Sequence, residues 1–143
     1  MTVVVDSGVI IAMVLVDEEF HEQAYRLIQG FSRTGETVVA PMLLRYELTA
    51  VLRKAVYQGR ITHRRGVSLL KNALKLNIEL VDDDALLVEA FAIARQYGFA
   101  RTYDPLYVAL AQRVDSVLWS ADQRLVRSVN RTFPAIRWLG DLS

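Results

Sequence analysis

Cysteine is absent from the 143 residues of this chain, and histidine occurs only twice, as His21 and His63. Without cysteine the chain has no disulfide, no zinc–thiolate site and no cysteine nucleophile. A histidine-based catalytic triad or a zinc site would have to use one of the two histidines. His63 lies in a basic segment and His21 in an acidic one, and no neighbouring residue marks either as catalytic. We expect His21 to be exposed to solvent.

Glycine and proline are also scarce, with seven and three residues, so there is little room for long loops. The apolar first 16 residues are shorter than the ~20 of a membrane span. They lack a basic leader and are interrupted by Asp6 and Ser7, which argues against a signal peptide. We therefore expect a single domain over residues 1–143, located in the cytoplasm.

The net charge of +1 hides an uneven distribution of charged residues. Residues 45–75 carry eight bases and one acid, whereas residues 1–36 carry six acids and two bases. Residues 76–98 are again acidic, with five acids and one base. The basic segment either contacts phosphate groups or forms a solvated pair of helices, and charge alone favours the second interpretation.

Short apolar or β-branched runs alternate with amphipathic segments along the whole chain. We expect strands at residues 2–5, 37–40, 78–81, 116–119 and 134–139. Helices are expected at residues 7–16, 17–31, 42–58, 62–75, 104–111 and 120–129, and a further helix begins at Asp82 or Asp83 and ends at residue 97. Strands that alternate with helices predict a parallel sheet with right-handed crossovers. The expected fold is α/β: a three-layer α/β/α sandwich around a mainly parallel sheet of four or five strands.

Four carboxylates fall at positions where such a sheet binds ligands, beyond the carboxyl ends of its strands. Asp6 follows the first strand directly, and Asp122 follows the fourth by three residues. Asp104, together with Pro105, is expected to open a helix. Glu47 lies within a helix at the border of its apolar stripe, where a partly desolvated acid needs a partner.

Each of these acids also has an ordinary structural interpretation. Asp6 and Asp104 fit helix N-caps, Asp122 fits the first turn of a helix, and Glu47 fits a surface position. None of these interpretations explains why four acids should converge at one edge of a sheet. Converging carboxylates repel one another unless a divalent cation neutralises them, and oxygen ligands favour Mg²⁺ or Mn²⁺ over zinc. Such a metal site can activate water for phosphodiester hydrolysis without histidine, serine or cysteine.

The chain resembles the PIN domain family, and more narrowly the VapC-type toxin ribonucleases, over nearly its whole length. Four segments in this order carry the resemblance: residues 3–7 (Val-Val-Val-Asp-Ser), residues 46–48 (Tyr-Glu-Leu) after Pro41, residues 103–111 (Tyr-Asp-Pro-Leu-Tyr-Val-Ala-Leu-Ala) and residues 119–122 (Trp-Ser-Ala-Asp). Each segment is weak by itself, but the four together form a specific pattern. Many relatives have a good helix former where this chain has Pro105. Threonine is common where it has Ser120, so the hydroxyl is kept.

The resemblance implies a PIN-like fold and Mg²⁺- or Mn²⁺-dependent endonucleolytic cleavage of RNA. It assigns the metal-binding and catalytic acids to Asp6, Glu47, Asp104 and Asp122. Ser7 and Ser120 match the small hydroxyl residues that support the site. It further implies a homodimer and a cognate antitoxin, as in a toxin–antitoxin pair.

Other residues near the acids have two interpretations. Tyr103, Tyr107 and Trp119 either stack on RNA bases or belong to the core, and aromatic residues are more typical of the core. Arg101 and Arg124 either contact RNA phosphates or have a surface role.

The sequence also permits two functions other than a ribonuclease. One is a PIN-fold protein that binds RNA or a partner without cutting. The other is a phosphatase with Asp6 as nucleophile, a chemistry that usually has a second acid two residues on, where this chain has Gly8.

Overall fold

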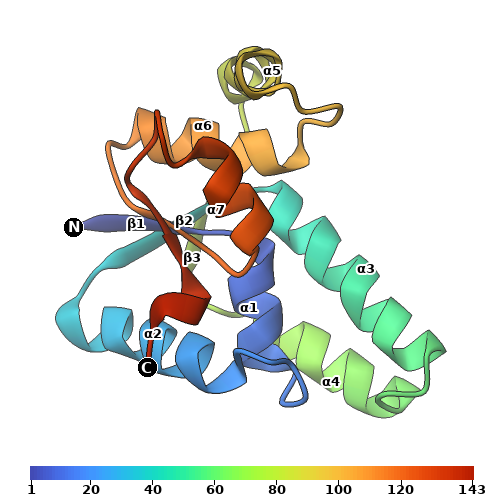
Figure 1. Ribbon diagram of the computed structural model, residues 1–143. Helices are drawn as coiled ribbons and strands as arrows, with labels where there is room; N and C mark the ends of the chain where they lie inside the picture. The colour runs from blue at the N-terminus through green and yellow to red at the C-terminus, as the bar shows by residue number, and fades with distance from the viewer.

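The computed structural model describes residues 1–143 and is built on one five-stranded sheet (Figure 1). The strands are β1 (Thr2–Val5), β2 (Thr37–Pro41), β3 (Ile78–Val81), β4 (Leu118–Ser120) and β5 (Ile136–Trp138). Their order is β3-β2-β1-β4-β5, and every neighbouring pair is parallel. The direction of strand addition reverses at β1, so the carboxyl ends of β1 and β4 flank the point where open α/β sheets bind ligands.

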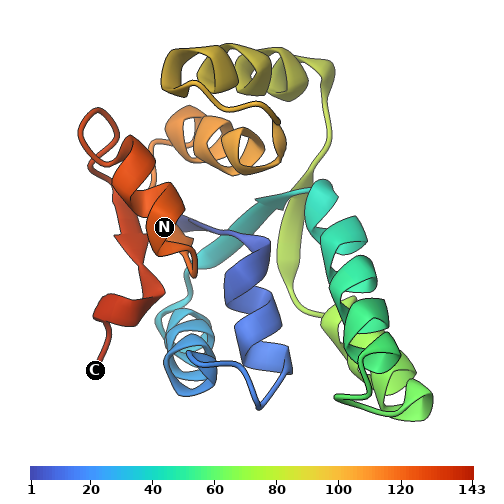
Figure 2. The same cartoon turned by 45° about the vertical axis from the view of Figure 1, so that its right-hand side comes forward.

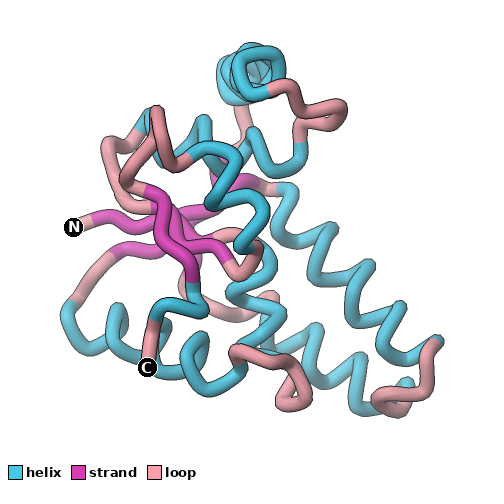
Figure 3. Tube along the Cα trace, in the orientation of Figure 1, coloured by secondary structure: helices cyan, strands magenta, loops and turns pink.

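Helices cover both faces of this sheet, which confirms the predicted α/β/α sandwich (Figures 1 and 2). On one face lie α6 (Tyr103–Arg113) and α7 (Gln123–Val129), with α5 (Asp84–Tyr97) stacked on the outside of α6. The other face carries α1 (Ser7–Val14) and α2 (His21–Thr34). A helical hairpin of α3 (Leu43–Tyr57) and α4 (His63–Ala73) projects beyond the sheet. The connecting loops are mostly short, as Figure 3 shows.

The hydrophobic core surrounds the central strand β1 and includes residues of the neighbouring strands and of the helices that cover the sheet. The β-branched run from Val3 to Val5 is buried completely or almost so, as expected of a central parallel strand. All residues from Pro105 to Ala111 in α6 are buried, because the sheet lies beneath this helix and α5 covers it. A smaller cluster formed by Leu15, Leu52 and Ala55 joins α1 to α3. No helix of the chain has the length and apolarity needed to cross a membrane.

The predicted start of α2 was wrong, because residues 17–20 form turns and the helix begins at His21. In these turns Arg60 holds Asp17 through two hydrogen bonds of 2.9 Å. The prediction of an exposed His21 was also wrong. Its side chain is half-buried, and Nδ1 lies 2.9 Å from the carbonyl oxygen of Ala12.

The starts of α6 and α7 also differ from the expectation. Thr102 is the N-cap of α6, so Asp104 lies in its first turn and does not cap the helix. At α7 the N-cap is Asp122, whose carboxylate accepts hydrogen bonds from the amides of Arg124 and Leu125. Ser120 cannot serve there because it is the last residue of β4 and is fully buried.

Candidate active site

An open cleft of about 420 Å³ lies at the carboxyl ends of β1 and β4, and we call it the acidic cleft. It is lined by Asp6, Ser7, Gly8, Asp104, Ala121, Asp122, Gln123 and Arg124. These residues come from three parts of the chain: the β1–α1 junction, the first turn of α6, and the segment from β4 into α7. Three of the four predicted acids therefore line one cleft, and the fourth, Glu47, lies outside this lining.

Asp6 is the most deeply buried of the acids, with 6% of its surface exposed. It caps α1, and its Oδ1 accepts a hydrogen bond of 3.1 Å from the amide of Val9. Burial raises the pKa of Asp6 from 3.8 to about 7, and the charge of Asp104 adds to the rise. Hydrogen bonds from the Ser120 hydroxyl and from the amides of Val9 and Ala121 oppose it. Asp6 is therefore both a helix cap and a carboxylate that resists ionisation.

Asp104 and Asp122 both line the cleft, but only the carboxylate of Asp122 accepts hydrogen bonds from the protein. Asp104 is half-buried, and burial followed by the charge of Asp122 raises its pKa. None of the causes that shift this pKa is a hydrogen bond, so no donor in the protein offsets the burial. Asp122 is exposed, and its carboxylate is engaged by the first turn of α7. The negative charges of Asp6, Asp104 and Asp122 thus oppose one another across one open space.

Glu47 is joined to this group through a buried tyrosine. The hydroxyl of Tyr107, which is 1% exposed, donates a 2.7 Å hydrogen bond to Oε1 of Glu47. Burial raises the pKa of Glu47, hydrogen bonds from the Tyr107 and Ser7 hydroxyls oppose the rise, and the charge of Asp104 adds to it. The pKa of Tyr107 is likewise raised, mainly by burial and then by the charge of Glu47. Ser7 and Tyr107 therefore form the hydroxyl environment that orients Glu47.

Gly8 allows the two halves of the cleft to approach closely. A Cβ atom at position 8 would lie 3.0 Å from Cβ of Ala121 and 3.3 Å from Oδ1 of Asp6. Both distances are tighter than ordinary van der Waals contact. The absence of a side chain at Gly8 thus brings the β1–α1 turn against the β4–α7 turn.

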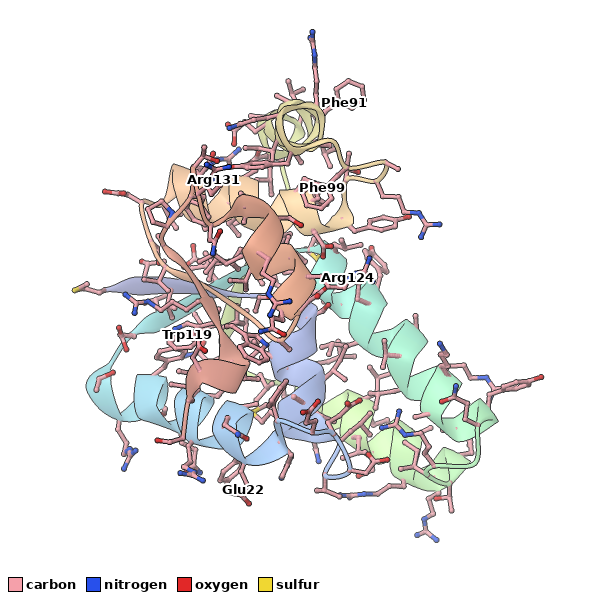
Figure 4. All side chains as sticks on the ribbon, viewed as in Figure 1. Glu22, Phe91, Phe99, Trp119, Arg124 and Arg131 are labelled. Carbon is pink, nitrogen blue, oxygen red and sulfur yellow. The ribbon has the colours of Figure 1, made fainter.

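The remaining predicted residues fall into two groups. The Oγ of Ser120 accepts a 3.0 Å hydrogen bond from the amide of Asp122, which fixes the turn carrying that acid. Arg124 lines the cleft and is exposed (Figure 4). Arg101 is exposed on the loop before α6 and lines none of the cleft.

The three aromatic residues that the sequence placed near the acids lie in different parts of the structure. Tyr107 belongs to the core, whereas Tyr103 is exposed. Trp119 does not lie at the cleft. It lines a larger hollow of about 660 Å³ at the amino-terminal ends of the strands, which also takes in Phe31 and Phe133. Its lining contains two acids, Glu36 and Asp115, and none of the four predicted site acids, so its size gives no reason to prefer it as the active site.

The chemistry of the acidic cleft suits a hard cation, because every charged donor in the set is a carboxylate oxygen. In the present side-chain arrangement, however, no three His, Asp or Glu residues are grouped so that they could hold a metal ion. Asp6 and Asp122 direct oxygens at backbone amides, and Glu47 directs one at Tyr107. The fold brings the acids to one region, while their side chains keep separate partners.

Sequence inspection missed two residues of this site. Tyr107 was expected either in the core or stacked on RNA, and its hydrogen bond to Glu47 spans 60 positions of the chain. Gly8 was noted only as the absence of an acid. A glycine directly after Asp6 and Ser7, at the start of a helix, was the available signal for a close approach.

Comparisons with known proteins identify the family of this chain and its fold. The sequence pattern of the PIN domain matches residues 3–130. The chain is 28% identical over 138 residues to Ribonuclease VapC3 of Pyrobaculum aerophilum, covering 95% of this chain and 98% of that protein.

Two solved structures are similar in fold. The crystal structure of PAE2754 from Pyrobaculum aerophilum has a TM-score of 0.71 at 20% identity, covering 99% of this chain and 95% of that one. The structure of VapC20 from Mycobacterium tuberculosis, a toxin that cleaves the sarcin-ricin loop, has a TM-score of 0.66 at 15% identity and covers 88% of this chain and 94% of that one. The structural likeness confirms the fold, and the sequence match supplies the family: this chain belongs to the PIN domain family.

Proposed function

We propose that this protein is a metal-dependent endoribonuclease whose acidic cleft cleaves RNA phosphodiester bonds. The observation that carries the proposal is the environment of Asp104. This half-buried carboxylate lacks a protein hydrogen-bond donor that offsets its burial, and the charges of Asp104, Asp6 and Asp122 oppose one another. A divalent cation would offset this burial and repulsion together. The similarity to a protein named Ribonuclease VapC3 supports RNA as the substrate.

In this proposal Asp6, Asp104 and Asp122 hold Mg²⁺ or Mn²⁺, and Glu47 completes the acidic quartet. The bound metal would supply an activated water and stabilise negative charge on the phosphate. No hydrogen bond fixes the Asp104 side chain, so it is free to turn toward a cation, whereas Asp122 is exposed and has only its Oδ1 engaged by the amides of α7. Ser120 fixes the Asp122 turn, and Ser7 supports Glu47.

The basic residues provide the surface that would meet the RNA backbone. Arg124 stands at the edge of the cleft, where a guanidinium can pair with a phosphate. The eight bases of residues 45–75 are all exposed on the α3–α4 hairpin. Only Arg60 among them forms an ion pair, with Asp17 and Glu18. We assign Arg124 to the phosphate next to the cleft. Arg101, on the loop before α6, is assigned to a more distant one.

The biological role that fits this activity is the toxin of a toxin–antitoxin pair, acting in the cytoplasm as a homodimer and held inactive by a cognate antitoxin. Solved structures of similar fold include VapBC2 from Rickettsia felis and VapBC-1 from nontypeable Haemophilus influenzae. Both resemble this chain at low identity, 14% and 12%, so they support the fold from which the role is inferred.

The test is RNA cleavage by purified protein with Mg²⁺ or Mn²⁺, compared with the Asp6→Asn and Asp104→Asn variants. Both variants keep the side-chain shape but remove the negative charge. We expect cleavage and growth inhibition by the unaltered protein and loss of both in each variant. Full activity in both variants would show that the acids are not the catalytic groups.

A second candidate function is a PIN-fold protein that binds RNA or a partner without cutting. It is favoured by the finding that no three acids are grouped around a metal position in the structure. Thermal melting with millimolar Mn²⁺ separates the two, since a metal bound only by the folded chain raises the melting temperature. A rise that is absent from Asp104→Asn supports the ribonuclease, and the absence of any rise in the unaltered protein supports the binding protein.

A further inference from the structure

A second hollow lies on the other side of the first turn of α6. Its volume is about 330 Å³, and it is bounded by the first turns of α3, α5 and α6. We call it the tyrosine hollow, after the two tyrosines among its lining residues. The lining consists of Pro41, Met42, Leu43, Tyr46, Val81, Asp82, Asp83, Leu86, Leu87, Thr102, Tyr103 and Leu106. The floor is thus apolar, while the tyrosines and acids supply polar groups.

The side chains of Tyr46 and Tyr103 are largely open to solvent, with exposed fractions of 68% and 53%. The only aromatic pairs in the structure are Phe20–Trp138, His21–Tyr25 and Tyr97–Phe99, so neither ring is stacked on another. Their hydroxyls take part in none of the side-chain hydrogen bonds of the chain, unlike that of Tyr107. Both rings therefore present free aromatic surface at the same hollow.

The tyrosine hollow is continuous along the chain with the proposed active site. Tyr46 directly precedes Glu47 on α3, and Tyr103 directly precedes Asp104 on α6. Tyr103 lines the tyrosine hollow while Asp104 lines the acidic cleft, so one helical turn forms a wall of both. The acidic cleft and the tyrosine hollow are therefore neighbours on either side of the first turn of α6.

The acids that line the tyrosine hollow favour a base over a phosphate as its ligand. Asp83 is already committed, since Arg113 contacts both of its oxygens at 2.7 and 3.0 Å and the amide of Leu86 donates to Oδ1. Asp82 is exposed, and none of the hydrogen bonds or ion pairs of the chain uses its carboxylate. A free carboxylate repels phosphate but accepts hydrogen bonds from an exocyclic amino group of a base.

We propose that the tyrosine hollow binds one unpaired nucleobase of the RNA beside the acidic cleft, by stacking on Tyr46 and Tyr103. This inference rests on the proposed ribonuclease function. Stacking on aromatic rings is the usual way in which proteins hold single-stranded bases, and it requires a base that is not paired in a duplex. Asp82 adds a preference for bases with an exocyclic amino group, which cytosine, adenine and guanine have, over uracil, which has none.

The experiment measures binding of fluorescein-labelled single-stranded RNA by fluorescence anisotropy, in an Asp6→Asn background that suppresses cleavage. The probes are oligo(rA), oligo(rC) and oligo(rU) of about ten nucleotides. Tyr46→Ala and Tyr103→Ala are each compared with the phenylalanine variant at the same position, which keeps the ring. Tyr57→Ala is the matched control, because Tyr57 lies on the same helix as Tyr46, is 81% exposed and lines none of these hollows.

We expect each alanine variant to weaken binding of oligo(rA) and oligo(rC) by about tenfold, as loss of base stacking does elsewhere. The phenylalanine variants and Tyr57→Ala should remain within about twofold of the parent, since stacking is retained in both cases. Oligo(rU) should bind more weakly than oligo(rC), and Asp82→Ala should remove that difference. Because the substituted residues are exposed, we expect the melting temperatures of the variants to be unchanged, and measuring them checks that each variant is folded.

Two results would overturn the inference. One is binding within about twofold of the parent for both alanine variants and all three probes. The other is a shift from dimer to monomer in the alanine variants with RNA affinity unchanged, which would make the hollow a contact between two copies of the chain.

The outcomes for the base site and for the proposed function are separable. If the unaltered protein cleaves RNA but the tyrosine variants bind normally, the base site is wrong and the ribonuclease stands. If it does not cleave RNA but binding depends on both tyrosines, the ribonuclease is wrong and the base site stands.

Discussion

Loss of the hydrogen bond between Tyr107 and Glu47 should lower both the stability of the fold and the metal affinity of the proposed site. In Tyr107→Phe the ring remains in the core and only the hydroxyl is lost, so the 2.7 Å hydrogen bond to Glu47 disappears without a cavity. A hydrogen bond to a charged group contributes about 1.5–3 kcal/mol. Ser7 still donates to Glu47, and solvent reaches part of the carboxylate. We therefore expect a loss of about 1–2 kcal/mol at pH 7, or a fall in melting temperature of roughly 3–8 °C.

The effect of Tyr107→Phe should depend on pH in a defined direction. Burial already raises the folded-state pKa of Glu47 above its ordinary value of 4.5, and losing the hydroxyl raises it further. The folded protein then binds a proton that the unfolded chain has released, so the free energy of unfolding falls as pH rises above 4.5. The difference between the variant and the unaltered protein should be largest at neutral pH and shrink near pH 4, where Glu47 is protonated in both states.

The assay is urea unfolding at several pH values, with Tyr97→Phe as the matched control. The Tyr97 hydroxyl bonds to that of Thr132, a neutral partner, so its loss should give a pH-independent change. Because Glu47 belongs to the proposed acidic quartet, Tyr107→Phe should also raise the metal concentration needed for half-maximal RNA cleavage. A stability loss of equal size at pH 4 and pH 7 would refute the view that Tyr107 stabilises an ionised Glu47.

Three further predictions concern the acidic cleft. For Asp6, whose folded pKa of about 7 exceeds the unfolded 3.8, stability of the metal-free protein should fall by up to about 4 kcal/mol between pH 4 and pH 8. Urea unfolding in EDTA should show the fall, and Asp6→Asn should abolish it; an equal fall in the variant would assign it elsewhere. Gly8→Ala should cost about 1–3 kcal/mol and lower RNA cleavage, because its Cβ meets Ala121 at 3.0 Å, and unchanged melting and activity would contradict this. Arg124→Ala should weaken RNA binding and reduce the salt slope of log Kd by about one, whereas Arg131→Ala, at an exposed position outside the cleft lining, should do neither.

Much of the fold was predictable because local signals and tertiary packing agree. The run from Thr2 to Val5 is β-branched and ends at an acid, and the structure has a strand with those bounds. The helix expected to end at residue 97 does so, and Gly98 follows it with a φ of 72°, in the left-handed region that favours glycine. The expected start of a helix at residue 120 was wrong. Ser120 is a residue type that often caps helices, but it pairs with Trp138 in the sheet and is therefore the last residue of β4.

The sequence by itself determined the alternation of strands and helices and the placement of Asp6 after the first strand, because these depend on residues close together in the chain. It also determined the PIN domain pattern, because that pattern consists of four short segments in a fixed order. Tertiary structure alone decided the strand order, which sets β1 beside β4 and so joins Asp6 to Asp122 across one cleft. It also decided that Tyr107 donates to Glu47, and that Tyr46 and Tyr103 share a hollow. Such pairs are separated by more than 50 positions, and only the placement of α3 and α6 against the same sheet fixes how their side chains meet.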